Sequence, residues 1–115
     1  MKKTKMLKKN YEFRNVLSKG TYYSGKYIEA FIQKQKQQKL NFLGIAVSVK
    51  VAKAVKRNHI KRLIKENYRN KEEQIKSGNR IVLLWKKKAN IQDATYHNIK
   101  KDMQTIFDKA NINKE

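Results

Sequence analysis

The first apolar pattern along the chain has helical spacing. Phe13, Val16 and Leu17 recur at positions i, i+3 and i+4, which lie on one face of a helix. Gly20 follows at a position where a helix ends readily. The sequence therefore predicts a short first helix. Residues 1–9 before it form a basic tail that we expect to be flexible.

After Gly20 the period of the pattern changes from helical to two. Over 22–32 the pattern has a period near two, so this segment is predicted to be a strand with Tyr27, Glu29 and Phe31 on one face and Ile28, Ala30 and Ile32 on the other. Residues 40–50 predict a second strand, with one apolar face and one face of mostly small residues. The polar residues 33–39 between them are expected to form the tip of a hairpin.

The rest of the chain predicts a helix, a strand and a second helix. We expect the main helix over 54–69, a third strand over 80–85, and a last helix capped by Asn90 with an apolar stripe from Ile99 to Ala110. The order α-β-β-α-β-α predicts an α+β fold, with residues 1–115 forming one α/β sandwich domain. A strand, a helix and a strand in succession imply a βαβ crossover within a mixed sheet.

Charge narrows the choice of partner. The 115 residues include 29 Lys and Arg against 9 Asp and Glu, a formal net charge of +20, while 39% of the residues are hydrophobic. Such self-repulsion favours a polyanionic partner, either nucleic acid or an anionic membrane. No long apolar run, membrane-binding amphipathic helix or lipidation signal is evident, so we expect no membrane contact. The absence of Cys and of a signal peptide predicts a cytoplasmic protein.

The positive charge is concentrated around the main helix. Residues 50–71 contain nine Lys or Arg and one Glu. At 100° per residue, Ile60 and Ile64 lie on one face of the helix and Lys61 and Lys65 on the adjoining face. A merely solvated helix face normally mixes charges of both signs. This one-sided pattern favours binding to a polyanion over simple solvation.

The same helix carries a family resemblance. The run AVKRNHIKRLIKE from Ala54 to Glu66 resembles the "RNR" signature of the protein subunit of bacterial ribonuclease P. The similarity continues in LKKNYEF at 7–13 and GIAVS at 44–48, and it extends over about residues 6–110. The resemblance implies the same α-β-β-α-β-α fold. It also implies a protein partner of a catalytic RNA, which uses Mg²⁺ held mainly by the RNA to remove the 5′ leader of precursor tRNA.

The resemblance implies two groups of site residues. The set expected to bind the RNA subunit is Lys53, Lys56, Arg57, Asn58, His59, Lys61, Arg62, Lys65 and Arg69. The set expected to line a cleft for the 5′ leader is Phe13, Leu17, Tyr27, Phe31, Ser48 and Lys50. Several positions depart from the family pattern. Among them, His59 replaces a basic residue, Val49 replaces the first of two lysines, and Leu17 stands where an aromatic residue is common.

Catalysis by the protein itself is not expected. The nine acidic residues are dispersed, and His59 and His97 fall in different predicted helices, so we predict no catalytic residue, no tightly bound metal and no obligate protein partner. The alternative is a non-enzymatic ribosomal or ribosome-assembly protein, which would share the size and the basic helix. The predicted strands argue against a helix-turn-helix DNA-binding protein.

Overall fold

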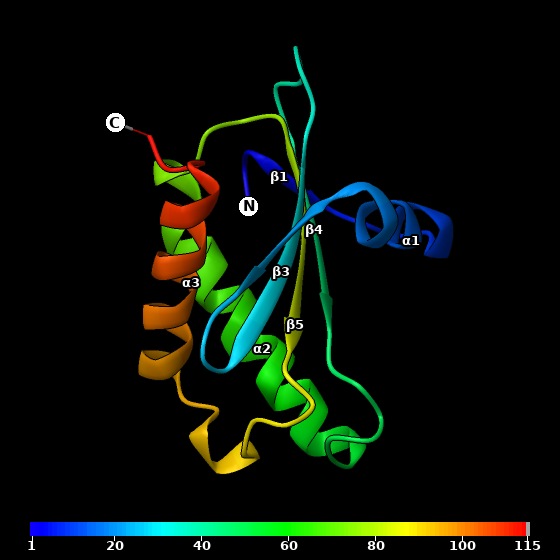
Figure 1. The fold of residues 1–115 in the computed structure, drawn as a ribbon, viewed down its shortest axis with the longest axis vertical. Coiled ribbons are helices and arrows are strands. Elements are labelled where there is room, and N and C mark those ends of the chain that lie inside the picture. The colour runs from blue at the N-terminus through cyan, green and yellow to red at the C-terminus, as the bar shows by residue number, and fades with distance from the viewer. Residues whose placement is uncertain (115) are drawn as a thin grey trace.

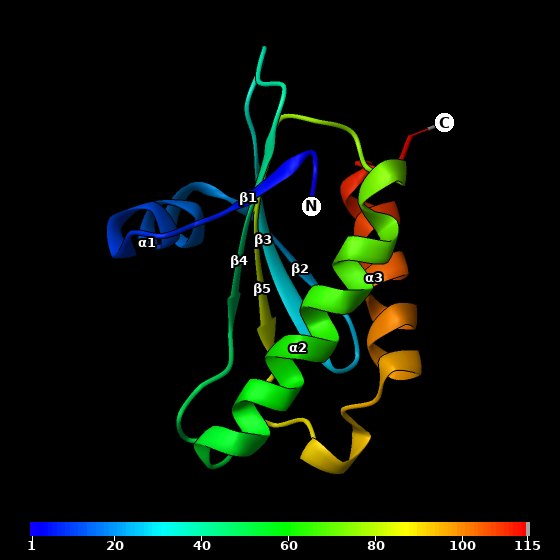
Figure 2. The same ribbon diagram turned by 180° about the vertical axis from the view of Figure 1, so that it is seen from behind.

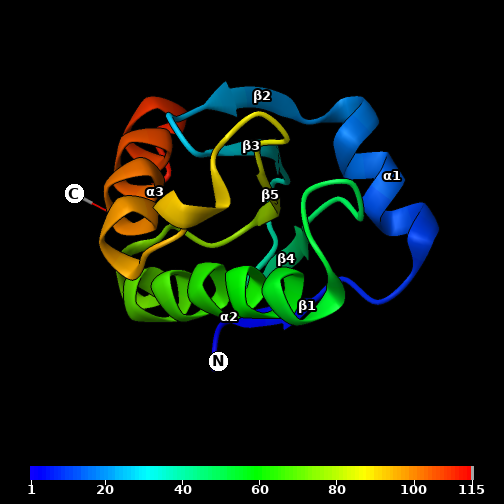
Figure 3. The ribbon, with the colours of Figure 1, turned by 90° about the horizontal axis from the view of Figure 1, so that it is seen from below.

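The computed structural model describes residues 1–114, which form a central sheet with helices on both faces (Figure 1). The five strands lie in the order β1-β4-β5-β3-β2. Helices α2 and α3 cover one face of the sheet, and α1 lies on the other face (Figure 3). The elements are β1 (Thr4–Met6), α1 (Asn10–Lys19), β2 (Thr21–Ser24), β3 (Ile28–Lys34), β4 (Asn41–Ala46), α2 (Ala54–Lys71), η1 (Glu72–Gln74), β5 (Asn79–Trp85), η2 (Ile91–Asp93) and α3 (Tyr96–Ala110).

The βαβ crossover is formed by β4, α2 and β5. β4 and β5 pair in parallel, with Leu43 opposite Ile81 and Ile45 opposite Leu83. β5 also pairs antiparallel with β3, which makes the sheet mixed. The predicted α+β class, the mixed sheet and the crossover are therefore confirmed. The predicted element order lacks β1 and merges β2 with β3.

The segment 22–32, predicted as one strand, is a hairpin of β2 and β3. Its turn is held from α3, where the Asp102 carboxylate accepts the backbone N–H groups of residues 26–28 at distances of 2.5 to 3.0 Å. A Cβ on Gly25 would lie 2.7 Å from the carboxyl carbon of Asp102. The prediction of a single strand was wrong because the partner of this turn lies 75 residues away in the chain.

The polar segment 33–39 is not a hairpin tip. β3 and β4 flank it in sequence, but β5 lies between them in the sheet. The segment therefore carries the chain across one end of β5. Gly78, in the turn before β5, has a φ of 84°, and the Gln35 N–H donates to its carbonyl at 2.7 Å. This positive φ favours glycine, as expected for a tight turn.

Part of the basic tail is ordered in the sheet. Thr4–Met6 form β1, which pairs in parallel with β4, and the Thr4 hydroxyl is hydrogen-bonded to that of Tyr68 at 2.8 Å. The expected flexibility of 1–9 is therefore wrong for these three residues. β4 itself ends at Ala46, four residues earlier than predicted, and Val49 is 73% exposed in the loop that follows.

The main core lies between the sheet and the pair α2 and α3. Trp85, Tyr68 and Phe107 are its largest buried side chains, and Tyr68 and Phe107 pack edge to face with ring centroids 6.4 Å apart. Burial raises the pKa of Tyr68 to about 12, since the ionised phenolate would lose its hydration. At the start of α3, Thr95 rather than Asn90 is the N-cap, and Asn90 caps η2 instead.

Candidate nucleic-acid interface

Helix α2 has the two faces that its sequence predicts. Ile60 and Ile64 are buried against the core, and Leu63 is half-buried beside them. The opposite side carries a cationic ridge, defined by the residues predicted to bind the RNA subunit. Seven ridge residues are exposed and two are half-buried; the exposed residues are Lys53, Lys56, Asn58, His59, Arg62, Lys65 and Arg69, and the half-buried ones are Arg57 and Lys61.

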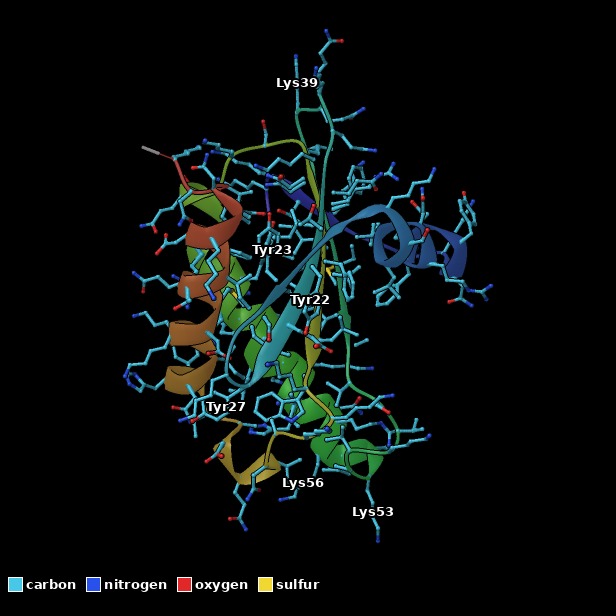
Figure 4. The ribbon with its side chains drawn as sticks, viewed as in Figure 1. Tyr22, Tyr23, Tyr27, Lys39, Lys53 and Lys56 are labelled. Atoms are coloured by element: carbon cyan, nitrogen blue, oxygen red, sulfur yellow. The ribbon has the colours of Figure 1, made fainter. Side chains whose placement is uncertain are left out.

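The ridge keeps nearly all of its charge uncompensated. Within residues 1–114 the only salt bridge joins Arg69 to Glu66 of the same helix at 2.8 Å. Exposed pairs of this kind contribute about 0–1 kcal/mol. Figure 4 shows Lys53 and Lys56 pointing away from the sheet at the lower end of α2. The ridge is therefore a surface of positive charge with little internal neutralisation.

One ridge residue has a structural contact as well. The Arg57 guanidinium donates through Nη1 to the carbonyl oxygen of Ala52 at 2.7 Å. This bond ties the loop after β4 to the first turn of α2. Beside it, Val55, His59 and Arg62 contribute to a depression of 520 Å³ on the outer side of the helix. Within residues 1–114 no ion pair or side-chain hydrogen bond engages Arg62, so its guanidinium donors and the remaining ones of Arg57 are available to phosphate oxygens.

The second candidate surface is the α1 face of the sheet. Strand register places Phe31 opposite Val82 and Val82 opposite Gly44 on this face. α1 can approach because Gly44 has no side chain, since a Cβ there would lie 2.7 Å from the Phe13 ring. Phe13, Leu17 and Phe31 are all half-buried. The structure thus brings these three predicted leader-binding residues to the same face.

Ser48 and Lys50 lie in the loop between β4 and α2. Ser48 is half-buried and its hydroxyl accepts the backbone N–H of Lys50 at 3.2 Å. The Lys50 side chain is exposed. The loop therefore presents a hydroxyl and an ammonium group near the carboxyl end of β4, between the sheet and the cationic ridge.

Tyr27 does not share a strand face with Phe31, so this part of the prediction is wrong. Tyr27 precedes β3, and its ring stacks on the buried Trp85 with centroids 6.1 Å apart and an interplanar angle of 8°. It packs against the core on the side of α2 and α3. Figure 4 shows Tyr27 well separated from Tyr22 along the sheet. We therefore exclude Tyr27 from the α1 face.

The aromatic neighbour of Phe31 is Tyr22, which was absent from the predicted set. Tyr22 lies directly opposite Phe31 across the β2–β3 pair, with ring centroids 5.1 Å apart. Its hydroxyl donates to Glu29 at 2.6 Å, and the residue is 49% exposed. The acceptor Glu29 raises the pKa of Tyr22, since it stabilises the protonated hydroxyl. A hairpin turn at Gly25 was the sequence signal that would have identified this pair.

Two further features bear on the class of protein. Within residues 1–114 no group of three or more His, Cys, Asp and Glu side chains is placed to hold a metal ion. None of the helices in this range combines the length and the hydropathy that crossing a bilayer requires. Fold and site together define a small α+β protein with a strongly basic crossover helix.

Comparison with known proteins identifies the family. The family model described as Ribonuclease P matches residues 1–111. The chain therefore belongs to the ribonuclease P protein component family, whose members are subunits of the tRNA-processing endoribonuclease ribonuclease P. Relatives named ribonuclease P protein component include one from Clostridioides difficile, 40% identical over 96% of this chain and 95% of the relative, and one from Fusobacterium nucleatum, 40% identical over 92% and 96%.

Solved structures agree with this assignment. The RNase P protein of Staphylococcus aureus superposes with a TM-score of 0.80 at 27% identity, covering 93% of this chain and 95% of that chain. The protein from Thermotoga maritima has a TM-score of 0.79 at 22% identity, covering 91% and 96%, and supports the fold alone. Membership of this family therefore decides against the alternative class, a ribosomal or ribosome-assembly protein.

Proposed function

We propose that this chain binds the RNA subunit of ribonuclease P through the cationic ridge of α2, and the 5′ leader of precursor tRNA on the α1 face. Binding in these two places promotes maturation of the tRNA 5′ end. The observation that supports the proposal most strongly is the ridge itself, because its cations are exposed and almost none is paired with an acid. A solvated helix of a protein without a polyanionic partner would have more mixed charge.

The physical role of the ridge is to replace the counterions of the RNA. Each Lys or Arg that neutralises a phosphate releases condensed cations, and binding then weakens as salt concentration rises. Arg62 is exposed and its side chain has no protein partner within residues 1–114. Its fork-shaped guanidinium suits bidentate contact with phosphate. Docking of the ridge would also lower the repulsion between RNA segments that must approach each other.

The α1 face suits a single strand of variable sequence. Phe31 and Tyr22 form an aromatic pair at the exposed part of the sheet, and stacking of a base on an aromatic ring contributes about 1–3 kcal/mol without regard to base identity. Lys50 is exposed nearby and supplies a charge for a phosphate. Phe13 and Leu17 of α1 form the apolar wall on the other side.

The proposed division of labour leaves the chemistry to the RNA. We propose that the Mg²⁺ of the holoenzyme is held mainly by the RNA, and we assign no step to a metal on the protein. The protein contributes binding and positioning only. The proposed place of action is the cytoplasm, and no further protein partner is needed for it.

Reconstitution with a bacterial ribonuclease P RNA at low Mg²⁺ tests the first part. The wild-type chain should restore removal of the 5′ leader. Arg62→Ala should weaken binding to the RNA subunit and make the slope of log K against log salt shallower by about one unit, as expected for one lost phosphate contact. Lys109→Ala, an equal loss of charge at an exposed position of α3, is the matched control. Equal effects of the two variants would contradict a specific role for the ridge.

Phe31→Ala tests the second part. Binding to the RNA subunit should stay unchanged, while the preference for precursor over mature tRNA should fall by about tenfold, the equivalent of one lost stacking contact. The control is Tyr11→Ala, which removes an exposed aromatic ring from α1 outside this face. If Phe31→Ala weakened binding of both tRNAs to the same extent, the residue would be a packing residue only.

A further inference from the structure

Helices α2 and α3 pack side by side (Figure 2). Residues of α2, α3 and the η1 turn line a small pocket. Its volume is 190 Å³, and it is lined by Asn67, Asn70, Lys71, Gln74, Tyr96 and Lys100. All six side chains are polar or charged, and two of them are cations. The pocket lies at the carboxyl-terminal half of α2 and the first turns of α3, away from the α1 face.

Asn67 is the buried group at the bottom of the pocket. It is 1% exposed, and its Nδ2 donates to the carbonyl oxygens of Leu63 at 3.0 Å and Tyr96 at 3.2 Å. These two acceptors fix the orientation of the side-chain amide. Its Oδ1 is then left without a hydrogen-bond partner within residues 1–114. A buried acceptor in this state is unfavourable unless something else donates to it.

Two cations flank this acceptor from different helices. Lys71 of α2 is half-buried, and Lys100 of α3 is exposed. Burial, followed by repulsion from Lys100, lowers the pKa of Lys71, while the charge of Asp108 acts in the opposite direction. An anion placed between the two ammonium groups would relieve their repulsion.

Tyr96 adds a hydroxyl to the pocket. Its oxygen accepts the side-chain N–H of Asn70 at 2.6 Å, so its own hydrogen remains available for donation. The pocket therefore combines three donors suited to a phosphate, on Tyr96, Lys71 and Lys100, with one buried acceptor on Asn67. A simple anion would satisfy the donors and leave the acceptor unpaired.

We propose that this pocket binds one ribose phosphate unit of an RNA backbone. The 2′-hydroxyl donates to Asn67 Oδ1, and the adjoining phosphate lies between Lys71 and Lys100. DNA lacks that hydroxyl, so the pocket distinguishes RNA from DNA at this point. The inference rests on the proposed RNA-binding function and adds a second contact outside the predicted ridge.

Nuclear magnetic resonance of the ¹⁵N-labelled full chain tests the proposal directly. The side-chain NH₂ of Asn67 reports on the pocket, and backbone amides around Arg62 report on the ridge. A single-stranded RNA of about ten nucleotides should shift both sets of signals. DNA of the same sequence should shift the ridge signals and leave the Asn67 side chain unchanged.

The affinity for RNA can be obtained from the change of the Asn67 shift as RNA is added. Lys100→Gln should lower this affinity about fivefold, as expected for one lost phosphate contact. Lys101→Gln is the matched control, because Lys101 is the next residue of α3, is exposed and does not line the pocket. The wild-type response to RNA should persist in this control.

Each remaining outcome overturns the inference. Equal Asn67 shifts with RNA and DNA would mean that the pocket binds phosphate without reading the 2′-hydroxyl. Ridge shifts without an Asn67 shift would mean that only water fills the pocket, and the proposed RNA-binding function would still stand. The loss of all shifts would contradict both the pocket and the proposed function.

Discussion

At the scale of single residues, Asp102 shows how much one buried carboxylate organises. It is 7% exposed and accepts three consecutive backbone N–H groups of the β2–β3 turn. Charge-assisted bonds of this kind are about twice as strong as neutral ones. This turn sets the register of β2 and β3, which places Tyr22 opposite Phe31 on the α1 face.

Asp102→Asn should therefore lower the free energy of unfolding by about 2 kcal/mol, because a neutral amide is a weaker acceptor and brings an N–H group towards the backbone donors. Urea denaturation measures the change. Asp108→Asn is the control, since Asp108 is exposed on the same helix. A loss of the same size in both variants would show that net charge, and not the turn, was responsible.

At the scale of secondary-structure elements, the approach of α1 to the sheet depends on Gly44. The missing side chain lets the Phe13 ring pack directly on β4, and a Cβ would lie 2.7 Å and 2.9 Å from two atoms of that ring. Real Cβ atoms essentially never make contacts of that length, so the Phe13 ring, and with it the packing of α1 on the sheet, would have to shift. Because α1 carries Phe13 and Leu17, its position determines one side of the proposed leader site.

Gly44→Ala should lower stability by about 2 kcal/mol through overpacking and should reduce the preference for precursor over mature tRNA. Thermal unfolding and tRNA binding measure the two effects. The double variant Gly44→Ala with Phe13→Ala removes the two shortest contacts and leaves one of 3.2 Å with Leu7, so there the alanine at 44 should lower stability much less. A full, additive loss in the double variant would locate the strain elsewhere.

At the scale of the whole molecule, the net charge of +20 opposes folding to a compact state. Within residues 1–114 one ion pair is present, so internal pairing relieves little of this repulsion. The fold is held instead by the apolar core and the sheet, and the ridge stays exposed. Stability and binding are thus coupled through the same charges, since a polyanion relieves the repulsion as it binds.

Added salt should consequently stabilise the free protein. Raising sodium chloride from about 10 mM to about 150 mM shortens the Debye length from about 30 Å to about 8 Å. If roughly 1 kcal/mol of repulsion is screened, the Tm should rise by about 4 °C. Calorimetry measures the change. A Tm that falls with salt would mean that attractive ion pairs dominate.

The amino-acid sequence by itself determined the basic crossover helix, its two faces, the α+β class and the family. These features depend on local periodicity and composition. Ile60 and Ile64 could therefore be assigned to the buried side of α2, and Arg62 to the exposed side, before the tertiary structure was known. The "RNR"-like run could be read in the same way, because its members are neighbours on one helix.

Only the tertiary structure decided the pairing of β1 with β4, the turn held by Asp102, the exchange of Tyr27 for Tyr22 on the α1 face, and the pocket around Asn67. Each of these depends on a partner distant in sequence: Tyr68 for Thr4, α3 for the turn, Trp85 for Tyr27 and Tyr96 for Asn67. Contacts of this range form only when the chain is folded. Gly25 could have indicated a turn in the sequence, but no local pattern indicated the distant partners that hold these features in place.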